Sequence, residues 1–261
     1  MRMRTFAMIF AMASLFTQAR AGAPLHFYTE EWIPFNYTNE AGNIDGFTTA
    51  VVKKIAHNLG TKVEIEVQPW SRALQSAQSA ENKVIYSVYR TPEREKLFKW
   101  VGPIHKVETV LWGLEESKLS IRNLEDAKQY KIAVQADSAY VTELEKKGFN
   151  KSKIVSNYAT QEIEMVIRGT ADLVPLSILS ITKLNARTKD QQSKTRVGSA
   201  HWKPYATLFS DELYLGFNLA TPDATVAEWQ KELNRLKDSS FYKDIEKTYV
   251  SPIVSEANRY R

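Results

Sequence analysis

The feature that most constrains the fold is a regular alternation of extended and helical segments. The segment Leu25–Thr29 (LHFYT) is typical of a strand. In residues 46–60 (GFTTAVVKKIAHNLG) the apolar residues recur at helical spacing, and Gly60 stands where a helix C-cap is expected. Residues 61–69 (TKVEIEVQP) alternate apolar and polar side chains and end at a proline, which indicates a strand. Strands that alternate with helices in this way favour a parallel α/β sheet.

The alternation continues along the chain and is interrupted twice by extended apolar runs. A helix face at Trp70–Ala77 and a strand at Lys83–Val88 complete the first set. The extended runs are 107–114 (VETVLWGL) and 212–219 (ELYLGFNL), and a second set of elements lies between them. In the second set we expect strands at 131–135, 153–155 and 171–176, and helices at 138–147, at 160–168 and up to about Arg187.

Two helices are expected to close the chain, with Asp223 and either Ser239 or Ser240 as N-caps. Trp229 lies on the apolar face of the first of them and is expected in the core. Two lobes joined by two crossing strands explain this order of elements. The expected boundaries are a first lobe of residues 22–110 and 213–261, a second lobe of residues 111–212, and hinges near 107–114 and 208–219.

Residues 1–21 have the layout of a secretory signal peptide. Arg2 and Arg4 precede an uncharged apolar run, and Ala19-Arg20-Ala21 matches a small-residue cleavage pattern. The run is shorter than the about 20 residues that a transmembrane helix needs. A buried N-terminal helix is the alternative. We therefore expect an exported, periplasmic mature protein with no stable membrane insertion.

Charge and residue usage argue against several classes of function. The net charge of +5 falls to +2 without the three arginines of residues 1–21, so nothing indicates nucleic-acid binding. The chain has no cysteine, which excludes disulfides, thiol nucleophiles and cysteine metal sites. Its four histidines lack metal-ligand spacing, and it has no phosphate-binding loop, dinucleotide fingerprint or nucleophile elbow. We expect no metal, no cofactor and no catalysis.

The stretch 87–100 (SVYRTPEREKLFKW) predicts the end of a strand, a turn and the start of a helix. Thr91 can cap that helix and Pro92 suits its first position. These helix-start features do not require Arg94, which on this reasoning alone lies on the helix surface. Arg90 is expected in solvent.

Several short motifs follow one another between Leu25 and Tyr249. They are WIPFNY, GNIDGFTTAVVKKIAHNLG, PWSRAL, TPERE with GPI, KIAVQADSAYVTEL, GTADLVPLS and ELYLGFNL. Each is weak alone, but their order and spacing are specific. Together they resemble extracytoplasmic solute-binding proteins of family 3, which include the amino-acid-binding components of ABC transporters.

This resemblance implies a fold and a function. The fold is the two-lobed, type II periplasmic-binding-protein fold, an α/β fold in which each lobe is a mixed, mainly parallel sheet flanked by helices. The lobes close about two hinge strands on a small polar ligand, here expected to bear a carboxylate. The expected partner is an inner-membrane ABC permease, and the protein is expected to act as a monomer.

The resemblance also implies roles for individual residues. Arg94 matches the arginine of the family's T-x-x-R element, which pairs with the ligand's carboxylate through its planar fork. Trp32 and Trp70 match aromatic positions that flank the ligand, with core packing as the alternative. Ser87 and Tyr89 lie on the segment that lines the cleft.

Positions in the second lobe follow from the same comparison, and the chain departs from the family at several places. Asp137 and Ser138 match a loop that meets the carboxylate, although either can simply cap the next helix. Ser177 stands where amino-acid binders usually have the acidic partner of the ligand's ammonium. Glu30 and Glu31 are the best substitutes for that partner, with exposed loop carboxylates as the alternative.

Two further departures concern size and charge. Tyr89 is bulky where the family has a small hydroxyl residue. Arg72, one turn into a helix near the cleft, either faces solvent or points inward, and an inward Arg72 would indicate a ligand with more than one negative group.

Two other functions remain open from the sequence. A few proteins of this fold resemble dehydratases that act on cyclic carboxylates, as cyclohexadienyl or arogenate dehydratases do. Such a site needs a positioned acid or base, for which Glu30, Glu31 or Asp137 could serve. A soluble sensor that docks on a membrane receptor is the other alternative.

Overall fold

The structure is a computed structural model of the 261-residue chain, and it describes residues 23–157, 161–180 and 200–253. The expected signal peptide, residues 1–21, lies outside the described residues. So does most of the helix expected to end near Arg187. No helix of the described residues is long and apolar enough to cross a membrane.

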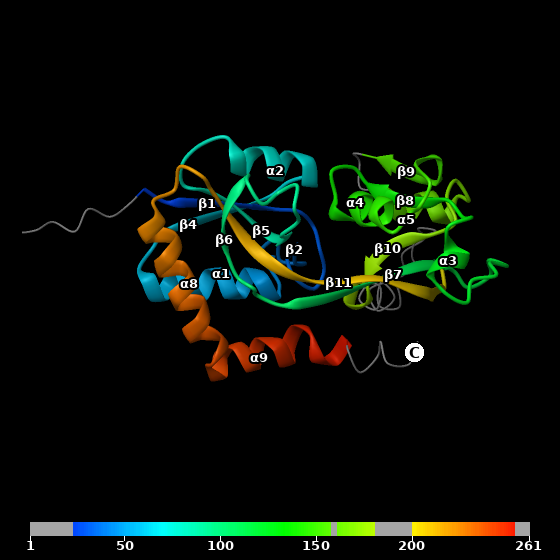
Figure 1. The fold of residues 1–261 in the computed structure, drawn as a ribbon. Helices are drawn as coiled ribbons and strands as arrows, with labels where there is room; N and C mark the ends of the chain where they lie inside the picture. Colours follow the sequence, from blue (N-terminus) through cyan, green and yellow to red (C-terminus); the bar gives the residue numbers. More distant parts are fainter. Residues whose placement is uncertain (1–22, 158–160, 181–199, 254–261) are drawn as a thin grey trace, which may run out of the picture.

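The first half of the molecule is built on three parallel strands, as the alternation predicts. The strand β1 (Leu25–Thr29) lies between β4 (Val63–Val67) and β5 (Lys83–Tyr89) and runs parallel to both. The helix α2 (Trp70–Gln78) covers one face of this sheet and α1 (Phe47–Leu59) covers the other (Figure 1). Ligand sites in open α/β sheets lie at the carboxyl ends of such strands.

Two antiparallel strands and two helices complete this half. The strand β11 (Trp202–Asn218) pairs with β5 and with β6 (Phe98–Val101) through its last residues. The helices α8 (Asp223–Lys237) and α9 (Ser240–Tyr249) then close the chain on the α1 side (Figure 1). Ser239 caps α9 by accepting a hydrogen bond from the Tyr242 backbone N–H, as expected. Pro222 rather than Asp223 is the N-cap of α8.

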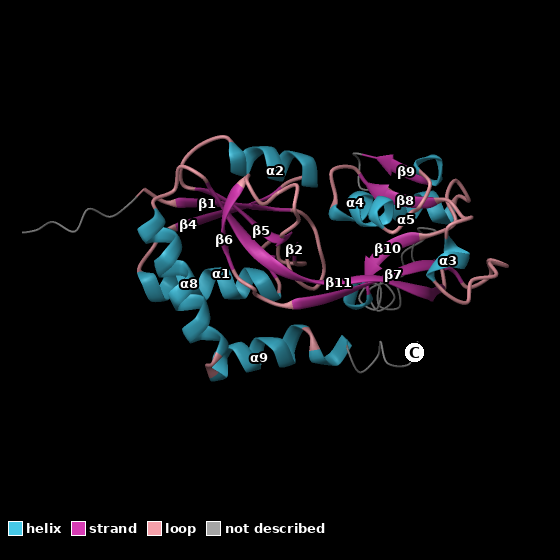
Figure 2. Ribbon diagram, in the orientation of Figure 1, coloured by secondary structure: helices cyan, strands magenta, loops and turns pink. Residues whose placement is uncertain are grey.

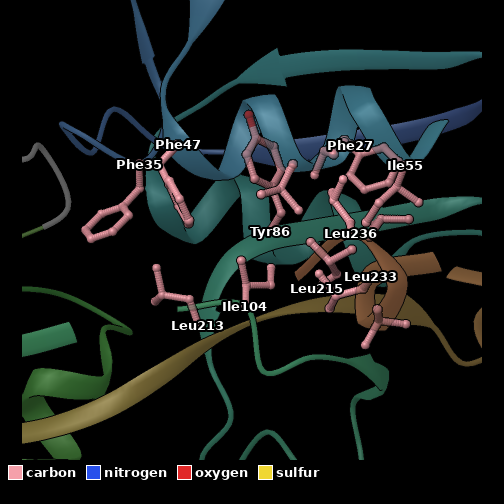
Figure 3. Close-up of a cluster of buried hydrophobic side chains, with 14 of the residues drawn as sticks. Phe27, Phe35, Phe47, Ile55, Tyr86, Ile104, Leu213, Leu215, Leu233 and Leu236 are labelled. Atoms are coloured by element: carbon pink, nitrogen blue, oxygen red, sulfur yellow. The ribbon is translucent and has the colours of Figure 1, made fainter. Parts of the chain in front are cut away.

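Side chains from these elements form the main hydrophobic core. Trp229 of α8 is 1% exposed and packs against Phe27 of β1 at a ring-centroid distance of 5.1 Å. Figure 3 shows aromatic and aliphatic side chains of α1, β11 and α8 converging there. The core residues labelled in Figure 3 are Phe27, Phe35, Phe47, Ile55, Tyr86, Ile104, Leu213, Leu215, Leu233 and Leu236.

The second half is smaller and carries its own strands and helices (Figure 2). The strands β8 (Ile132–Gln135) and β9 (Ile154–Asn157) are parallel. The strand β10 (Val174–Ser177) is antiparallel to β7 (Lys106–Leu114), so the sheets are mixed. Among the described residues, the helices of this half include α3 (Leu124–Ala127), α4 (Ala139–Lys146) and α5 (Glu162–Ile167).

The strands β7 and β11 run between the halves as an antiparallel pair. Their register extends from Trp202 opposite Leu114 to Glu212 opposite Lys106. Beyond Glu212, β11 leaves β7 and pairs with β5 of the first half. The two crossing strands expected from the sequence are thus confirmed. The strand β11 begins ten residues earlier than the expected run 212–219, because its first part mixes polar and apolar residues and gives no continuous apolar run.

The prediction of a helix after Thr91 is wrong. Residues 92–97 form turns, in which the Arg94 N–H donates to the Thr91 carbonyl at 3.0 Å and the Leu97 N–H donates to the Arg94 carbonyl at 2.9 Å. These bonds span three residues, whereas an α-helix needs bonds that span four. The chain then enters β6, which the sequence did not predict, because pairing with β11 outweighs the local preference for a helix.

The start of α1 holds the loop that follows β1. The Phe47 and Thr48 N–H groups donate to the carbonyls of Pro34 and Phe35, each at 2.9 Å, which satisfies donors that a helix start leaves free. Gly46 makes this approach possible. Its φ is 117°, and a Cβ there would lie 2.6 Å from the Phe35 backbone.

We predict that Gly46→Ala destabilises the protein by about 1–3 kcal/mol more than Gly42→Ala does. Both glycines have a positive φ, but a Cβ at Gly42 would meet no atom within 4 Å. Urea denaturation of the two variants gives the free energies of unfolding. Equal losses for both would contradict the close-approach argument.

Candidate functional site

A small cavity of about 30 Å³ lies between the two halves of the molecule. That volume exceeds the about 10–15 Å³ that a single water molecule needs. Its walls come from the carboxyl ends of β1, β5 and β8 and from the start of α4, where an open α/β sheet places ligands. Its lining residues are Glu30, Trp32, Trp70, Ser87, Tyr89, Arg94, Gln135, Ser138, Ala139 and Tyr140.

Arg94 is the buried cation of this cavity, with a residue exposure of 6%. The guanidinium stacks on the Trp70 ring, with its central carbon 4.9 Å from the ring centroid. Its Nη1 donates to the Tyr89 carbonyl at 3.2 Å and its Nη2 donates to the Asp137 carbonyl at 2.8 Å. Burial lowers the pKa of Arg94 to about 10, against the opposing effect of Glu30, so the group stays charged at neutral pH.

Direct hydrogen bonds connect the two halves around the cavity. The Asp137 carbonyl accepts a second bond from Trp70 Nε1 at 2.8 Å, and the Asp137 carboxylate accepts one from Ser71 Oγ at 2.8 Å. On the other side, Trp32 Nε1 donates to Ser180 Oγ at 3.0 Å, and Ser180 Oγ donates to the Ile33 carbonyl at 2.7 Å. The halves are therefore in contact on both sides of the site.

Two hydroxyl groups in the wall of this cavity have no hydrogen-bond partner. They are Ser87 Oγ, on a residue that is 3% exposed, and Ser138 Oγ. The register between β5 and β11 passes from Val88 to Tyr86 and skips Ser87, whose φ is 58°. Such a bulge re-aims a side chain, and here it belongs to the cavity wall. Buried hydroxyls without partners are costly, so a ligand that bonds to them gains affinity.

Aromatic rings form a second wall that spans both halves. The Trp32 and Tyr89 rings meet edge to face at 5.7 Å, and Tyr89 meets Tyr140 of α4 in the same way at 6.4 Å. The Tyr89 and Thr109 hydroxyl groups are 3.4 Å apart. Burial raises the pKa of both tyrosines, so both stay neutral. Tyr89 thus fills the place of the family's small residue with a fixed, neutral ring.

A larger cavity of about 380 Å³ adjoins the small one. Glu30, Trp32, Gln135 and Tyr140 line both cavities. Its volume lies within the range of small-molecule sites. The residues that line it are Glu30, Glu31, Trp32, Ile33, Gln135, Tyr140, Glu162, Ile163, Leu176 and Ser180.

The carboxyl groups of the larger cavity hold their protons unusually strongly. Burial raises the pKa of Glu30 to about 7, opposed by a hydrogen bond from Gln135 and by the charge of Arg94, while Glu162 raises it further. Burial also raises the pKa of Glu162, whose Oε2 has no hydrogen-bond partner. Glu31, the third carboxyl group that lines this cavity, is exposed and accepts hydrogen bonds from the Thr38 N–H and hydroxyl.

Most of the site residues expected from the sequence come together in these cavities. The small cavity is lined by Arg94, Trp32, Trp70, Ser87, Tyr89, Ser138 and Glu30. Ser138 occupies the N-cap position of α4, as its alternative reading had it, but its side chain makes no cap hydrogen bond. Trp229 lies in the core as expected, and Arg90 pairs on the surface with Glu95 at 2.6 Å.

Three expected site residues line neither cavity. Arg72 is exposed on α2, because it follows Trp70 by two residues and a helix turns such a side chain to the opposite face. Ser177 is fully buried and accepts a hydrogen bond from the Leu179 N–H at 3.1 Å. Asp137 is exposed, lines neither cavity, and joins the two halves through its carbonyl and carboxylate.

Four polar lining residues were missed from the sequence. Gln135 ends β8, and the rule that ligands meet the carboxyl ends of parallel strands could have selected it. Tyr140, Glu162 and Ser180 lie on or beside short helical segments and carry no local signal. Only the meeting of the halves brings them to the site.

Comparisons with known proteins identify the family of the chain. The model of the family "Bacterial extracellular solute-binding proteins, family 3" matches residues 26–252. The chain belongs to this family. It is 27% identical over 142 residues to a "Probable amino-acid ABC transporter-binding protein" of Haemophilus influenzae, covering 54% of each chain. It is 25% identical over 166 residues to "Amino-acid-binding protein AabA" of Dichelobacter nodosus, covering 62% of this chain and 64% of that one. The matched part thus spans about half to two thirds of these relatives.

Solved structures confirm the fold of this family 3 protein. A histidine kinase sensor domain similar to periplasmic binding proteins superimposes with a TM-score of 0.76 at 15% identity, covering 89% of this chain and 97% of that one. An ancestral arginine-binding protein bound to arginine gives 0.75 at 21% identity, covering 88% and 100%. Both show the periplasmic-binding-protein fold that the motifs predict.

The raised pKa of Glu30 predicts a pH-dependent stability. A carboxyl group whose pKa is about 7 in the folded protein, against an ordinary 4.5, is stabilised in its protonated form. Its contribution is therefore complete below about pH 4.5 and is lost as the pH rises through about 7. We expect Glu30→Gln to remove this part of the pH dependence of the free energy of unfolding, measured in urea without ligand.

The matched control for this measurement is Glu31→Gln. Glu31 is the next residue but is exposed, so its variant controls for the loss of a carboxyl group in this loop. Identical profiles for Glu30→Gln and the wild type would show that Glu30 is not the titrating group.

Proposed function

We propose that the protein is a periplasmic binding protein that captures an α-amino acid, or a closely related carboxylate-bearing solute, and presents it to an inner-membrane ABC permease. Membership of family 3 and the names of the two curated relatives support this proposal. The relatives are named as binding proteins, which favours binding without catalysis. Export through residues 1–21 and action as a monomer belong to the same proposal.

The observation that supports it best is the surrounding of Arg94. A buried, charged guanidinium lies in a cavity between the halves, beside two buried hydroxyl groups without partners. Two of its N–H groups are bonded to carbonyls, and the others can make two parallel bonds to a carboxylate. Ser87 and Ser138 add hydroxyl donors from either half. A carboxylate is the group that this set of donors fits.

Glu30 is the proposed partner of the ligand's ammonium group. It lines the same cavity as Arg94, and the positive charge of Arg94 partly offsets the rise that burial causes in the pKa of Glu30. Ser177, at the position where the family usually has this acid, is buried away from both cavities. The zwitterionic head of an amino acid would thus lie between Arg94 and Glu30, with each charge facing its opposite.

Closure of the halves is the proposed mechanism of capture. The strands β7 and β11 connect the halves, and we propose hinges near 107–114 and 208–219, between lobes of residues 22–110 with 213–261 and of residues 111–212. Arg94 and Trp70 of the first lobe both bond to Asp137 of the second. Ser138 beside it offers the ligand a hydroxyl from the second lobe. A ligand that touches both lobes favours the closed state through contacts absent from the open one.

We predict that Arg94→Ala weakens binding of the best amino-acid ligand by at least about thirtyfold, because it removes one partner of a buried charge pair. Ligands can be identified by a thermal-shift screen of amino acids, dicarboxylates and polyamines, since a ligand of the native state raises the melting temperature. Calorimetry then gives the dissociation constants.

Arg90→Ala is the control, because Arg90 pairs with Glu95 on the surface and lines neither cavity. Unchanged affinity in Arg94→Ala, or a preference for polyamines, would overturn the carboxylate site. Turnover of prephenate or arogenate by the wild type would overturn binding without catalysis.

A further inference from the structure

We infer that the larger cavity receives a cationic side chain of the ligand and that Glu162 is the residue that selects it. The protein would then prefer basic amino acids, with a positive charge at the far end of the side chain, over neutral ones. This inference rests on the proposed function, because it needs the amino-acid head to lie between Arg94 and Glu30.

The two cavities share a wall, and this sets the direction of the ligand. Arg94 and Ser87 line only the small cavity, and Glu162 lines only the larger one. Glu30 lines both, so the ammonium group that pairs with Glu30 stands at their junction. A side chain that leaves the α-carbon there extends into the larger cavity towards Glu162.

The charged residues that line the larger cavity, among those described, are all acidic. Among the described residues that line it, the charged ones are Glu30, Glu31 and Glu162. Burial disfavours the ionised forms of Glu30 and Glu162. Glu162 Oε2 is also buried without a hydrogen-bond partner. A cation with N–H donors gives this oxygen its partner and offsets the burial of the charge.

The aromatic residues of the cavity suit the same ligand. Trp32 and Tyr140 line both cavities, so their rings lie along the path from the head of the ligand to Glu162. Aromatic faces attract cations, and they also cover the methylene groups of a long side chain. The volume of about 380 Å³ lies within the range of small-molecule sites and leaves room for a side chain beyond the head group.

Acidic, apolar and neutral amide side chains of a ligand fit the larger cavity less well than a basic side chain does. A second carboxylate on the ligand would face three carboxyl groups of like sign. An apolar side chain would leave Glu162 Oε2 buried and without a donor. A neutral amide could donate to Glu162 but would bring no charge to balance it.

The test compares each basic amino acid with a neutral analogue of similar length, so that shape stays nearly constant. L-arginine is paired with L-citrulline and L-lysine with L-norleucine, and calorimetry gives four dissociation constants for the wild-type protein. We expect the basic member of each pair to bind about 10- to 100-fold more tightly, as for a hydrogen bond to a charged group. In Glu162→Gln we expect this ratio to fall to near one, chiefly through weaker binding of the basic ligand.

Glu164→Gln is the matched control on the same helix. Glu164 pairs with Arg168 at 2.6 Å and lines neither cavity, so the ratio is expected to stay at its wild-type value. An unchanged ratio in Glu162→Gln, or tighter binding of the neutral member by the wild type, overturns the inference. If amino acids bind through Arg94 in either case, the proposed function still stands. If no amino acid binds the wild type at all, both fail.

A pH series gives a second test that needs no variant. The groups that face Glu162 and Glu30 around the cavities are Arg94, Glu31, Tyr89 and Tyr140, and the two tyrosines stay neutral. Because the pKa values of Glu30 and Glu162 are raised, both lose their protons as the pH rises. The arginine-to-citrulline affinity ratio should therefore increase from about pH 5 to about pH 8, where both ligand head groups keep the same charge. An arginine-to-citrulline affinity ratio that stays constant or falls with rising pH contradicts recognition of the side-chain charge by the Glu162 carboxylate.

Discussion

The burial of the Arg94 guanidinium is the constraint on which the rest of the site depends. A charge in this position needs partners, and they come from both halves of the molecule: the Trp70 ring, the Tyr89 carbonyl and the Asp137 carbonyl. The last of these links the first half to the start of α4. The same cation therefore holds the walls of the cavity together and leaves donors directed at a ligand. A lysine could not do both, since it lacks the planar set of donors.

The charge of Arg94 in the small cavity and the carboxyl groups of Glu30 and Glu162 in the larger cavity form one electrostatic system. Glu30 lies between Arg94, which favours its charge, and Glu162, which disfavours it. With no ligand, burial raises the pKa of both carboxyl groups and so favours their protonated, uncharged forms. A ligand with a cationic group would supply the charge that the cavity lacks. In the proposed site, recognition of a cation and proton release would be coupled, because the same carboxyl groups would serve both.

The fold supplies the positions that this balance requires. Parallel strands end together, so β1 places Glu30 beside Ser87 and Tyr89 of β5. Across the cavity, β8 ends at Gln135 and is followed by Ser138 and Tyr140. The long pairing of β7 with β11 keeps the two sets of strand ends facing each other, and a bulge at Ser87 turns one hydroxyl into the wall.

The sequence by itself determined the order of elements, the family, and most of the first half of the site. Apolar periodicity located β1, α1, β4, α2 and β5, and the T-x-x-R motif selected Arg94, because these signals are local. Local signals also led to the wrong helix after Thr91, where pairing of β6 with β11 prevailed. Only the tertiary structure decided that Ser177 lies away from the cavities and that Glu162 and Tyr140 line them. Those positions depend on how two distant parts of the chain meet, and no run of neighbouring residues records that meeting.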